Sequence, residues 1–405
     1  MPGPGYYMFG DEERKELLDV MEYGHLSRYG EPDDKRFKQK VLTFEKEFAA
    51  YTGTRYAQAT SGGTAALMCC FAALGIGPGD EVIVPCYMFV ATLTAAIQMR
   101  AVPVLAEIDE SLTMDPDDFE RKITPRTKAV IAVHTLGNPC DMDRILAIAD
   151  RHNIIVIEDA CQAAGASYKG KKTGSMGKMA AFSLNFYKTI TAGDGGIAVT
   201  NEPELYRRSF AFTDQGYDPG FSPQIGESPI CGVNLRMNEL TGAVALAQLR
   251  KLDTIVNMLR AKKHMLKEMI GELPSGVKYR RLNDPQECGT VMPIIFDDPQ
   301  KAEAFAAGLN SCVLTHTGYH VYSNLKQVRE KRTVSEFQCP FTCPVYKGGE
   351  TDYTRPMPQS DDIIGRTVNI SVGVVDGGLG THFGINILSS EDEIRQVAHK
   401  IKSLL

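Results

Sequence analysis

Hydrophobic positions between residues 55 and 200 follow two alternating patterns. Short, almost continuously apolar runs rich in β-branched residues alternate with longer stretches in which apolar residues recur every three to four positions. The first pattern predicts strands buried on both faces, and the second predicts helices that cover them. The predicted strands are 81–85, 101–108, 128–134 and 153–160, and the predicted helices are 64–75, 89–99 and 141–152. This order predicts a large α/β unit with a mainly parallel sheet.

The pattern changes after residue 175. Two further short strands are predicted at 179–185 and 195–200, and the residues between them are too few for a helix. A long helical pattern without proline at 237–269 predicts a helix that connects two domains. Beyond about residue 270, shorter segments and frequent prolines favour a smaller α+β domain. We therefore expect an N-terminal arm and helix over residues 1–35, a large domain over 36–265 and a small C-terminal domain over 266–405.

Composition and charge exclude several kinds of function. The chain has 405 residues, of which 43% are hydrophobic, so it can bury a deep site, and its formal net charge is −6. Acidic and basic residues are interspersed without a basic stripe, so we expect no nucleic-acid partner. The first fifteen residues lack the apolar run of a secretory signal, and the chain has no run of 18 uncharged apolar residues. We therefore expect a cytoplasmic protein without a membrane partner.

The ten cysteines are scattered along the chain, and several lie within apolar runs. This distribution predicts reduced, mostly buried side chains. Cys339 and Cys343 flank a PFT segment and could form half of a metal site. Because no second cysteine or histidine pair completes a set of four ligands, we expect no metal.

Three groups of polar residues follow predicted strands, at the edge where open α/β sheets bind ligands. In TSGGTAAL, residues 60–67, two glycines precede a helix start, which suits a phosphate group. The alternative is an ordinary loop with Ser61 or Thr64 as the helix cap. In EDACQA, residues 158–163, Asp159 follows a buried strand, where a carboxylate requires a cationic partner. The alternative for Asp159 is a cap for the following turn.

The third group contains Lys188, within FSLNFYKTITAGDGG at residues 182–196. Most lysines are solvated surface cations, which is the alternative interpretation here. A lysine that is partly removed from water is a better nucleophile toward carbonyl groups. Together, a phosphate-binding loop, a buried acid and such a lysine meet the requirements of pyridoxal 5′-phosphate (PLP). These requirements are a phosphate cradle, a pyridinium partner and a Schiff-base lysine.

Several motifs occur in the order and spacing of the DegT/DnrJ/EryC1/StrS sugar aminotransferases, which this sequence resembles. They are SGGTAAL, GPGDEVIVP, FVATLTA, ITPRTKAVIAVH, VIEDACQAAGASYKG, FSLNFYKTITAGDGGIAVTN and GVNLRMNELTGAVALAQLRKLD. The resemblance covers about residues 10–265 and is looser beyond them. It implies the aspartate aminotransferase-like fold type I and a PLP-dependent aminotransferase with a ping-pong mechanism. It also implies a homodimer with shared active sites.

The resemblance also implies a role for individual residues. Lys188 and Asp159 are the expected catalytic residues, with Lys188 attached to PLP and Asp159 paired with the pyridine nitrogen. Gln162 is expected near the ring hydroxyl, and Phe89 is expected to stack on the ring. The expected phosphate contacts are Gly63, Thr64, Ser183 and, from the neighbouring subunit, Asn234. Related sugar 3-dehydratases have histidine at the lysine position, so Lys188 favours transamination.

Candidate substrate contacts are Arg28 and Tyr29 in the N-terminal arm and Tyr319 and His320 in TGYHVY, although packing roles are an alternative for each. His134 could also touch the site, but a buried structural histidine is the favoured interpretation.

Further segments resemble those family members that act on 8-keto-3-deoxy-manno-octulosonate. These segments are FGDEE, MEYGHLSRYG, KTIT, LAQLRKLDTI and DYTRP. The expected amino acceptor is a keto or aldehyde carbon of a sugar, for which 8-keto-3-deoxy-manno-octulosonate is one candidate, or of a cyclitol-like compound, and the expected donor is glutamate. Gln215 and Asp194 stand where histidine and glutamate are usual, and neither position belongs to the expected cofactor contacts. Gln215 leaves the identity of the sugar open.

Two other kinds of function remain as alternatives. Another PLP reaction on a sugar or amino acid, such as that of a dehydratase, cyclase or oxidase, uses the same cofactor chemistry. A non-catalytic PLP-binding regulator is disfavoured, because no DNA-binding segment flanks the expected domain.

Overall fold

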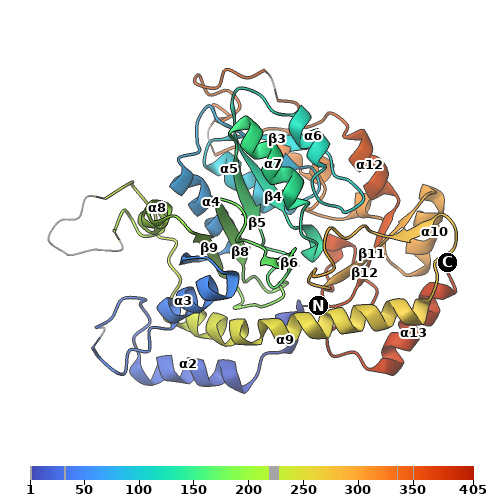
Figure 1. Ribbon diagram of the computed structural model, residues 1–405, viewed down its shortest axis with the longest axis horizontal. Coiled ribbons are helices and arrows are strands. Elements are labelled where there is room, and N and C mark those ends of the chain that lie inside the picture. Colours follow the sequence, from blue (N-terminus) through green and yellow to red (C-terminus); the bar gives the residue numbers. More distant parts are fainter. Residues whose placement is uncertain (1, 32, 219–227, 335, 350) are drawn as a thin grey trace.

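The computed structural model describes residues 2–31, 33–218, 228–334, 336–349 and 351–405. Its centre is a seven-stranded sheet in the order β1-β9-β8-β5-β4-β2-β3 (Figure 1). Neighbouring strands pair in parallel except β9, which is antiparallel to β8 and to β1. The strands are β1 (Tyr56–Thr60), β2 (Glu81–Pro85), β3 (Val102–Ala106), β4 (Thr127–Val133), β5 (Ile155–Asp159), β8 (Met179–Ser183) and β9 (Gly196–Thr200). The prediction of a mainly parallel sheet is confirmed.

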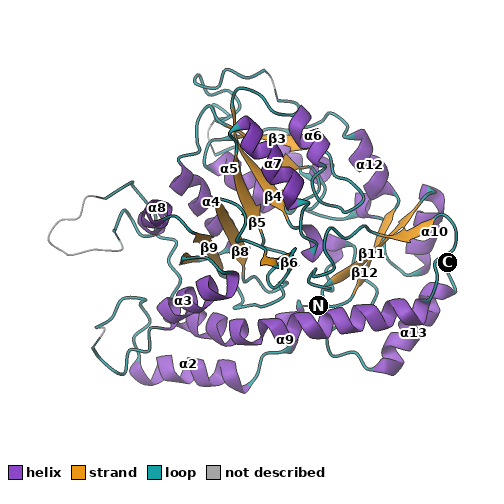
Figure 2. Cartoon of the chain, in the orientation of Figure 1, coloured by secondary structure: helices purple, strands orange, loops and turns teal. Residues whose placement is uncertain are grey.

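Helices surround this sheet (Figure 2) and bury both of its faces. Val82 and Val84 of β2 belong to one hydrophobic cluster with residues of α4 and α5, whereas Ile83 belongs to another with residues of α6 and α7. Because alternate side chains point to opposite faces, a strand buried on both faces has a continuous apolar sequence. The helices are α3 (Lys40–Thr52), α4 (Gly63–Leu74), α5 (Val90–Gln98), α6 (Pro116–Arg121), α7 (Met142–His152) and α8 (Pro203–Thr213).

The ends of α7 show how local sequence sets a helix boundary. The Asp141 side chain accepts a hydrogen bond from the Arg144 amide at 3.3 Å and so caps the first turn. Asn153, at the other end, has a φ of 54° in the left-handed region and stops the helix. Both residues are short and polar, and both flank the apolar period that predicts the helix.

The C-terminal part of the chain forms a three-stranded antiparallel sheet in the order β10-β11-β12. All six residues of the central strand β11 are buried. The strands and the helices of this part are β10 (Val277–Tyr279), β11 (Val291–Phe296), β12 (Thr367–Ser371), α10 (Pro299–Gly308), α11 (Lys326–Arg329), α12 (Pro358–Gly365) and α13 (Glu391–Lys402). A short hairpin of β6 (Ser167–Tyr168) and β7 (Lys171–Lys172) lies outside both sheets.

The long helix α9 (Glu239–Ile270) runs along both sheets, beneath them in the view of Figure 1. One hydrophobic cluster contains Leu246 and Leu259 of α9 together with residues of β8, β9, β11 and β12. The N-terminal helices α1 (Pro4–Tyr7) and α2 (Asp11–Tyr23) lie against the same helix. Because α9 shares a core with both sheets, the boundaries at residues 35 and 265 stay predictions.

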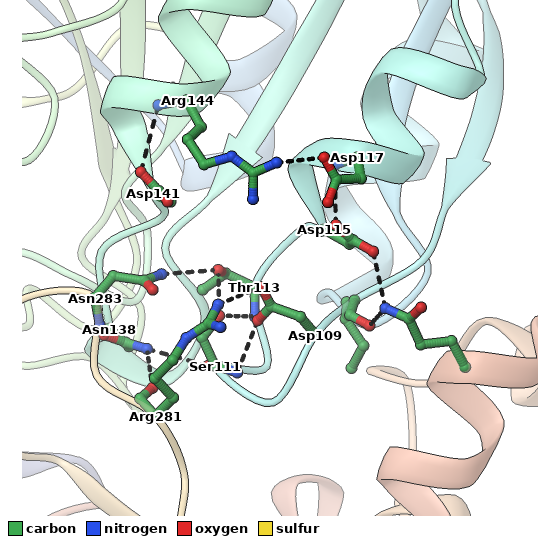
Figure 3. Close-up of polar contacts among 12 residues, drawn as sticks. Asp109, Ser111, Thr113, Asp115, Asp117, Asn138, Asp141, Arg144, Arg281 and Asn283 are labelled. Atoms are coloured by element: carbon green, nitrogen blue, oxygen red, sulfur yellow. Dashed lines mark hydrogen bonds and ion pairs between the residues drawn. The ribbon is translucent and has the colours of Figure 1, made fainter.

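Polar contacts join the small sheet to loops of the large one (Figure 3). Asn138 Nδ2 donates hydrogen bonds to the carbonyl oxygens of Ser111 and Arg281, both at 3.1 Å. Asn283 Nδ2 donates to Thr113 Oγ1 at 3.3 Å, and Arg281 forms an ion pair with Asp109. These contacts hold the end of β10 against the loops that follow β3 and β4, beside the candidate site.

No helix in the described ranges is long and apolar enough to cross a membrane. No group of three or more His, Cys, Asp or Glu side chains within the described residues could hold a metal ion. All ten cysteines are free thiols.

Candidate active site

A cavity of about 420 Å³ lies at the carboxyl ends of β5 and β8. Its position agrees with the edge of the sheet at which the sequence predicts a ligand. Nine of the twelve predicted site residues line it, namely Gly63, Thr64, Phe89, Asp159, Gln162, Ser183, Lys188, Tyr319 and His320. Arg28, Tyr29 and Asn234 do not line it. Residues more than 250 positions apart in the sequence therefore meet around one space.

One end of the cavity suits a phosphate group. Gly63 is the first residue of α4, and Thr64 lies in the first turn, where free amide groups point out of the helix. A Cβ added to Gly63 would lie only 2.7 Å from the Ser183 Cβ, so α4 and β8 touch at this point. The hydroxyl groups of Thr64 and Ser183 border the same space. Helix dipole, amides and hydroxyls together favour an anion here.

Asp159 forms part of the cavity floor and is only 5% exposed. Its Oδ2 accepts a hydrogen bond from Thr92 Oγ1 at 2.7 Å, and its Oδ1 accepts one from the Cys161 amide at 3.1 Å. Among the described residues, no lysine, arginine or histidine forms an ion pair with it. A buried carboxylate without a cationic partner in the protein favours a cationic group of a ligand, such as the protonated ring nitrogen of PLP.

Gln162 and Phe89 border the space above Asp159. Gln162 Oε1 accepts a hydrogen bond from the Leu136 amide at 2.7 Å, which leaves the Nε2 hydrogens for an oxygen of a ligand. Leu136 has a φ of 53°, a left-handed conformation that is rare for a residue with a side chain. The Phe89 ring is 40% exposed and offers a face on which a flat ring can stack.

Lys188 lies in the turn that follows β8. Its amide donates to the Asn185 carbonyl at 2.9 Å, and its Nζ lies 5.7 Å from the centre of the Phe89 ring. The side chain is partly buried and lines the cavity. This placement argues against the freely solvated surface cation of the alternative interpretation.

Tyr319 and His320 form the opposite wall, because their segment pairs with residues 87–90. The amides of Met88 and Val90 donate to the carbonyls of His320 and Tyr319 at 3.0 and 2.9 Å. His320 Nδ1 lies 3.1 Å from the Gly378 carbonyl, so Nδ1 carries the hydrogen and Nε2 is an acceptor. Burial lowers the pKa of His320 to about 3, and the charge of Lys188 acts in the same direction. The ring is therefore neutral at pH 7.

Several residues of the wall were not among the predicted cofactor or substrate contacts. They are Thr92, Leu136, Asn185, Tyr187, Asp194, Thr290 and Asp376. Thr92 lies within FVATLTA, but no pattern in the sequence indicates that its hydroxyl reaches Asp159. Asp194 was expected outside the cofactor contacts and nevertheless lines the cavity. Asp376 follows β12, and only the packing of the small sheet brings it to the site.

Arg28 and Tyr29 lie away from the cavity of their own chain. The Arg28 guanidinium forms an ion pair with the buried Glu45 at 2.9 Å, and the Tyr29 hydroxyl donates to Asp214. Both side chains are thus held by acids, one in α3 and one at the end of α8. The prediction that they contact substrate is not supported within one chain.

Asn234 is exposed and forms a β-bridge with Asp214. Its predicted contact is with the phosphate of a neighbouring subunit, so a single chain leaves this prediction untested. Gln215 lies next to it, and its side chain accepts a hydrogen bond from Arg236 at 3.1 Å.

His134 has a structural role. Its ring is fully buried, its Nε2 lies 2.9 Å from Glu158 Oε2, and its Nδ1 accepts from the Cys140 amide at 3.0 Å. Burial alone would raise the pKa of Glu158, but His134 and the amides of Gly177 and Gly174 lower it below its usual value. This network anchors the end of β5 and so holds the backbone next to Asp159.

Comparison with known proteins agrees with this geometry. The sequence profile of the DegT/DnrJ/EryC1/StrS aminotransferase family matches residues 9–351. The chain belongs to this family. It is 43% identical to the GDP-perosamine synthase of Caulobacter vibrioides over 242 residues, which are 60% of this chain and 62% of that protein. It is 36% identical to the GDP-perosamine synthase of Vibrio cholerae over 298 residues, 73% of this chain and 77% of that protein.

The solved structures lead to the same fold. The chain superimposes on DesV of S. venezuelae, solved in complex with a ketimine intermediate, with a TM-score of 0.76 and 27% identity. That alignment covers 100% of this chain and 98% of the other. The predicted fold type I is confirmed, and PLP is the cofactor of this family. The phosphate end, the buried Asp159 and Lys188 provide the groups that PLP needs.

Proposed function

We propose that this protein transfers an amino group from glutamate to a keto or aldehyde carbon of a sugar, in two half-reactions on one site. The observation that supports this most directly is the meeting of Lys188, Asp159 and the Gly63 end of α4 around one cavity. Bound PLP supplies an electron sink for breaking the Cα–H bond of the amine substrate. The residues of the chain supply binding, orientation and proton transfer.

Asp159 holds a proton on the ring nitrogen of the cofactor. Its carboxylate stays in position because the Thr92 hydroxyl and the Cys161 amide donate to it. A negative charge fixed in a buried place favours the protonated ring, and this makes the ring a better electron acceptor.

With PLP bound, Lys188 Nζ would hold the cofactor and, as a free amine, would move a proton within the site. The neutral His320 presents Nε2 as an acceptor on the opposite wall.

The wall that includes Thr290, Tyr319 and Asp376 suits the hydroxyl groups of a sugar. Their carboxylate and two hydroxyl groups can accept hydrogen bonds from the hydroxyls of a sugar, and the two hydroxyl groups can also donate to them. None of these hydrogen bonds requires a charged sugar. Among the described residues that line the cavity, Lys188 is the only lysine or arginine. The carboxylates of glutamate therefore need a cation that the described cavity lining of one chain does not provide.

This requirement supports a homodimer with shared sites as part of the proposal. Tyr29, Tyr217 and Val233 are 44–46% exposed and lie next to the bridge between Asp214 and the exposed Asn234. We propose that a second copy covers this surface, brings Asn234 to its neighbour's phosphate and supplies the missing cation. Sedimentation of the purified protein tests the dimer, and a monomer that retains full activity would contradict it.

The first experiment is a single half-reaction with glutamate. We expect glutamate to convert the yellow PLP form into the pyridoxamine form with one equivalent of 2-oxoglutarate for each site. Borohydride reduction before glutamate should place the label on Lys188. Label on Lys172 or Lys178, or no conversion with any amino donor, argues against the proposal.

Lys188→Ala should reduce the rate of this half-reaction by about 10⁴-fold or more, because attachment and proton transfer are both lost. Lys178→Ala is the matched control. Lys178 directly precedes β8, at the other end of the strand from Lys188, and its side chain forms a surface ion pair with Glu202 at 3.0 Å and is 49% exposed. Its substitution should leave the rate unchanged.

The acceptor is best identified in the reverse direction, with amino sugars supplied as amines. We propose 8-keto-3-deoxy-manno-octulosonate as acceptor, so 8-amino-3,8-dideoxy-manno-octulosonate should convert the PLP form. Because two relatives are GDP-perosamine synthases, GDP-perosamine is the second amino sugar to test. Faster conversion with GDP-perosamine would reassign the acceptor to a nucleotide-linked sugar. Loss of water or ring closure instead of amine exchange would favour the dehydratase or cyclase alternative.

A further inference from the structure

The segment that carries the catalytic lysine is covered by the start of the chain. We call residues 3–13 the strap and residues 185–191 the lysine loop. The Gly3 amide donates to the Phe186 carbonyl at 3.1 Å, and the rings of Tyr6 and Phe186 lie 5.4 Å apart at an angle of 66°. The strap thus contacts the lysine loop through both backbone and side chain.

The fit between the strap and the lysine loop leaves no room for a side chain at two positions. A Cβ added to Gly3 would lie 2.4 Å from the carbonyl carbon of Tyr187 and 2.7 Å from the carbonyl oxygen of Lys188. A Cβ added to Gly5 would lie 2.6 Å from Gln248 Oε1 and 2.8 Å from both Ile190 Cα and Thr191 N. Most of these neighbours are backbone atoms of the lysine loop, so a side chain at either position would push the strap and the lysine loop apart.

Gln248 of α9 joins the strap to the lysine loop. Its side chain is fully buried, and its Oε1 accepts from the Thr191 amide at 3.2 Å. Its Nε2 donates to the Gly5 carbonyl at 3.1 Å and to Glu13 Oε1 at 2.8 Å. One amide group therefore satisfies donors and acceptors on both segments and fixes them to the longest helix.

The strap is in turn fixed by Glu13, whose side chain is fully buried. Glu13 Oε2 accepts from the Gly10 amide at 2.7 Å and from Lys251 Nζ at 2.8 Å. Lys251 Nζ also donates to the Met8 carbonyl at 2.8 Å. A buried, fully paired network of this kind has a single arrangement, because breaking one contact leaves the others unsatisfied.

We propose that the strap positions Lys188, with Gln248 as the positioning residue that couples the strap to the lysine loop. Neither touches the cavity, so their effect on the reaction passes through the backbone of residues 186–191. This inference rests on the proposed role of Lys188 and adds a distant group that the reaction needs.

The test compares Gln248→Leu and Gly5→Ala with Gly10→Ala in the full-length, PLP-loaded protein. Gly10 is a matched control, because it lies in the strap and an added Cβ would meet only Glu12 Oε2, at 3.5 Å, within 4 Å. Two quantities are measured. One is hydrogen exchange of the amides in residues 186–192, and the other is the pH at which the absorbance of the lysine-bound cofactor titrates.

We expect the Thr191 amide to exchange about tenfold faster in Gln248→Leu and Gly5→Ala, because a buried hydrogen bond is lost or strained. We also expect the absorbance midpoint to shift by about half a pH unit, because the surroundings of the Lys188 nitrogen change. Gly10→Ala should match the wild type in both. A lower melting temperature with unchanged exchange and an unchanged midpoint would show a merely structural role and overturn the proposal.

Gly3→Ala serves as a second variant if Gln248→Leu does not fold, because it removes no hydrogen-bonding side chain. The wild type separates the two possible failures. If the wild type shows no lysine-bound absorbance, the proposed function fails. If the wild type titrates normally and all three substitutions leave the midpoint and the exchange unchanged, only the role of the strap fails.

Discussion

The two walls of the cavity are built in different ways. One wall, the expected cofactor wall, is formed by Asp159 and Ser183 at the ends of β5 and β8 and by Gly63 at the start of α4, and the Asp159 and Ser183 side chains are buried and hydrogen-bonded. The opposite wall comes from the connections of the small sheet, and Tyr319 there is 60% exposed. The first wall is rigid because the sheet determines it, whereas the second depends on how the two sheets pack.

This difference indicates a division of work. A cofactor with one fixed chemistry needs invariable distances, which short turns on a buried sheet provide. An acceptor with many hydroxyls can be bound by loops that change without disturbing the sheet. Substitutions in the first wall should therefore affect both half-reactions, and those in the second should affect mainly the acceptor half-reaction.

The largest of these effects is expected for Asp159→Asn. Asparagine keeps the size and a hydrogen-bond acceptor but loses the charge that holds the ring proton. We expect both half-reactions to slow by roughly 10²–10³-fold, in line with the loss of a fixed electrostatic group. Stopped-flow absorbance measures each half-reaction separately. Asp143→Asn, an exposed member of an ion pair with Lys169, is the control and should have no effect.

Gly63→Ala tests the phosphate end of the same wall. The new methyl group would press on Ser183 and separate α4 from β8, so we expect PLP to bind about ten- to a hundredfold more weakly. Titration of the apoprotein with PLP, followed by absorbance, gives the affinity. Gly77→Ala, where an added Cβ has an ordinary 3.6 Å contact with Met99, should bind PLP normally. Unchanged affinity in Gly63→Ala would place the phosphate elsewhere.

His320 gives a prediction for the opposite wall that depends on pH. Its folded pKa of about 3 is lower than the usual value of 6.5, so below pH 6.5 the unfolded chain binds a proton that the folded chain does not. The stability that comes from keeping His320 neutral in the folded state is therefore fully present above pH 6.5, and it is lost as the pH falls from 6.5 toward 3. Each pH unit in this range should lower the free energy of unfolding by up to about 1.4 kcal/mol.

Urea unfolding of the wild type and His320→Gln at pH 7, 6 and 5 measures this effect. The difference between the two proteins should shrink or change sign as the pH falls, because glutamine does not titrate. Equal pH dependence in the two proteins would show that folding does not lower the pKa of His320.

The smallest effect is expected for Tyr319→Phe. The side chain is largely exposed, so it can contribute about one hydrogen bond to the acceptor, and the acceptor KM should rise by roughly threefold. The glutamate half-reaction should keep its rate. A loss in the glutamate half-reaction as large as that in the acceptor half-reaction would remove the proposed distinction between the walls.

The accuracy of the fold prediction follows the burial of each element. Strand β5 and helix α7 lie within two residues of the predicted bounds, because their apolar runs and caps act locally. Strand β1 was not predicted, since its sequence YAQAT has two small apolar residues and a glutamine. Gln58 is nevertheless only 1% exposed, and the pairing of β1 with β9 is what makes it a strand.

The site shows the same limit. Gly63, Asp159 and Lys188, which line the cavity, could be named from the sequence, because each has a chemical type that PLP requires and because Asp159 and Lys188 lie at the ends of predicted strands. Thr92 and Asp376 could not, since a threonine in a helix and an aspartate in a loop have many ordinary roles. The ion pair of Arg28 with Glu45 could not be named from the sequence either, because the two residues lie in different segments that only packing brings together.

The sequence alone determined the mainly parallel sheet, the edge at which a ligand binds and the cofactor that fits there. These depend on local periodicity and on residues next to strand ends, which the order of the chain specifies. The tertiary structure decided the composition of the second wall, the neutral state of His320 and the contact of the strap with the lysine loop. Each of these depends on segments far apart in the chain, and only packing determines which of them meet.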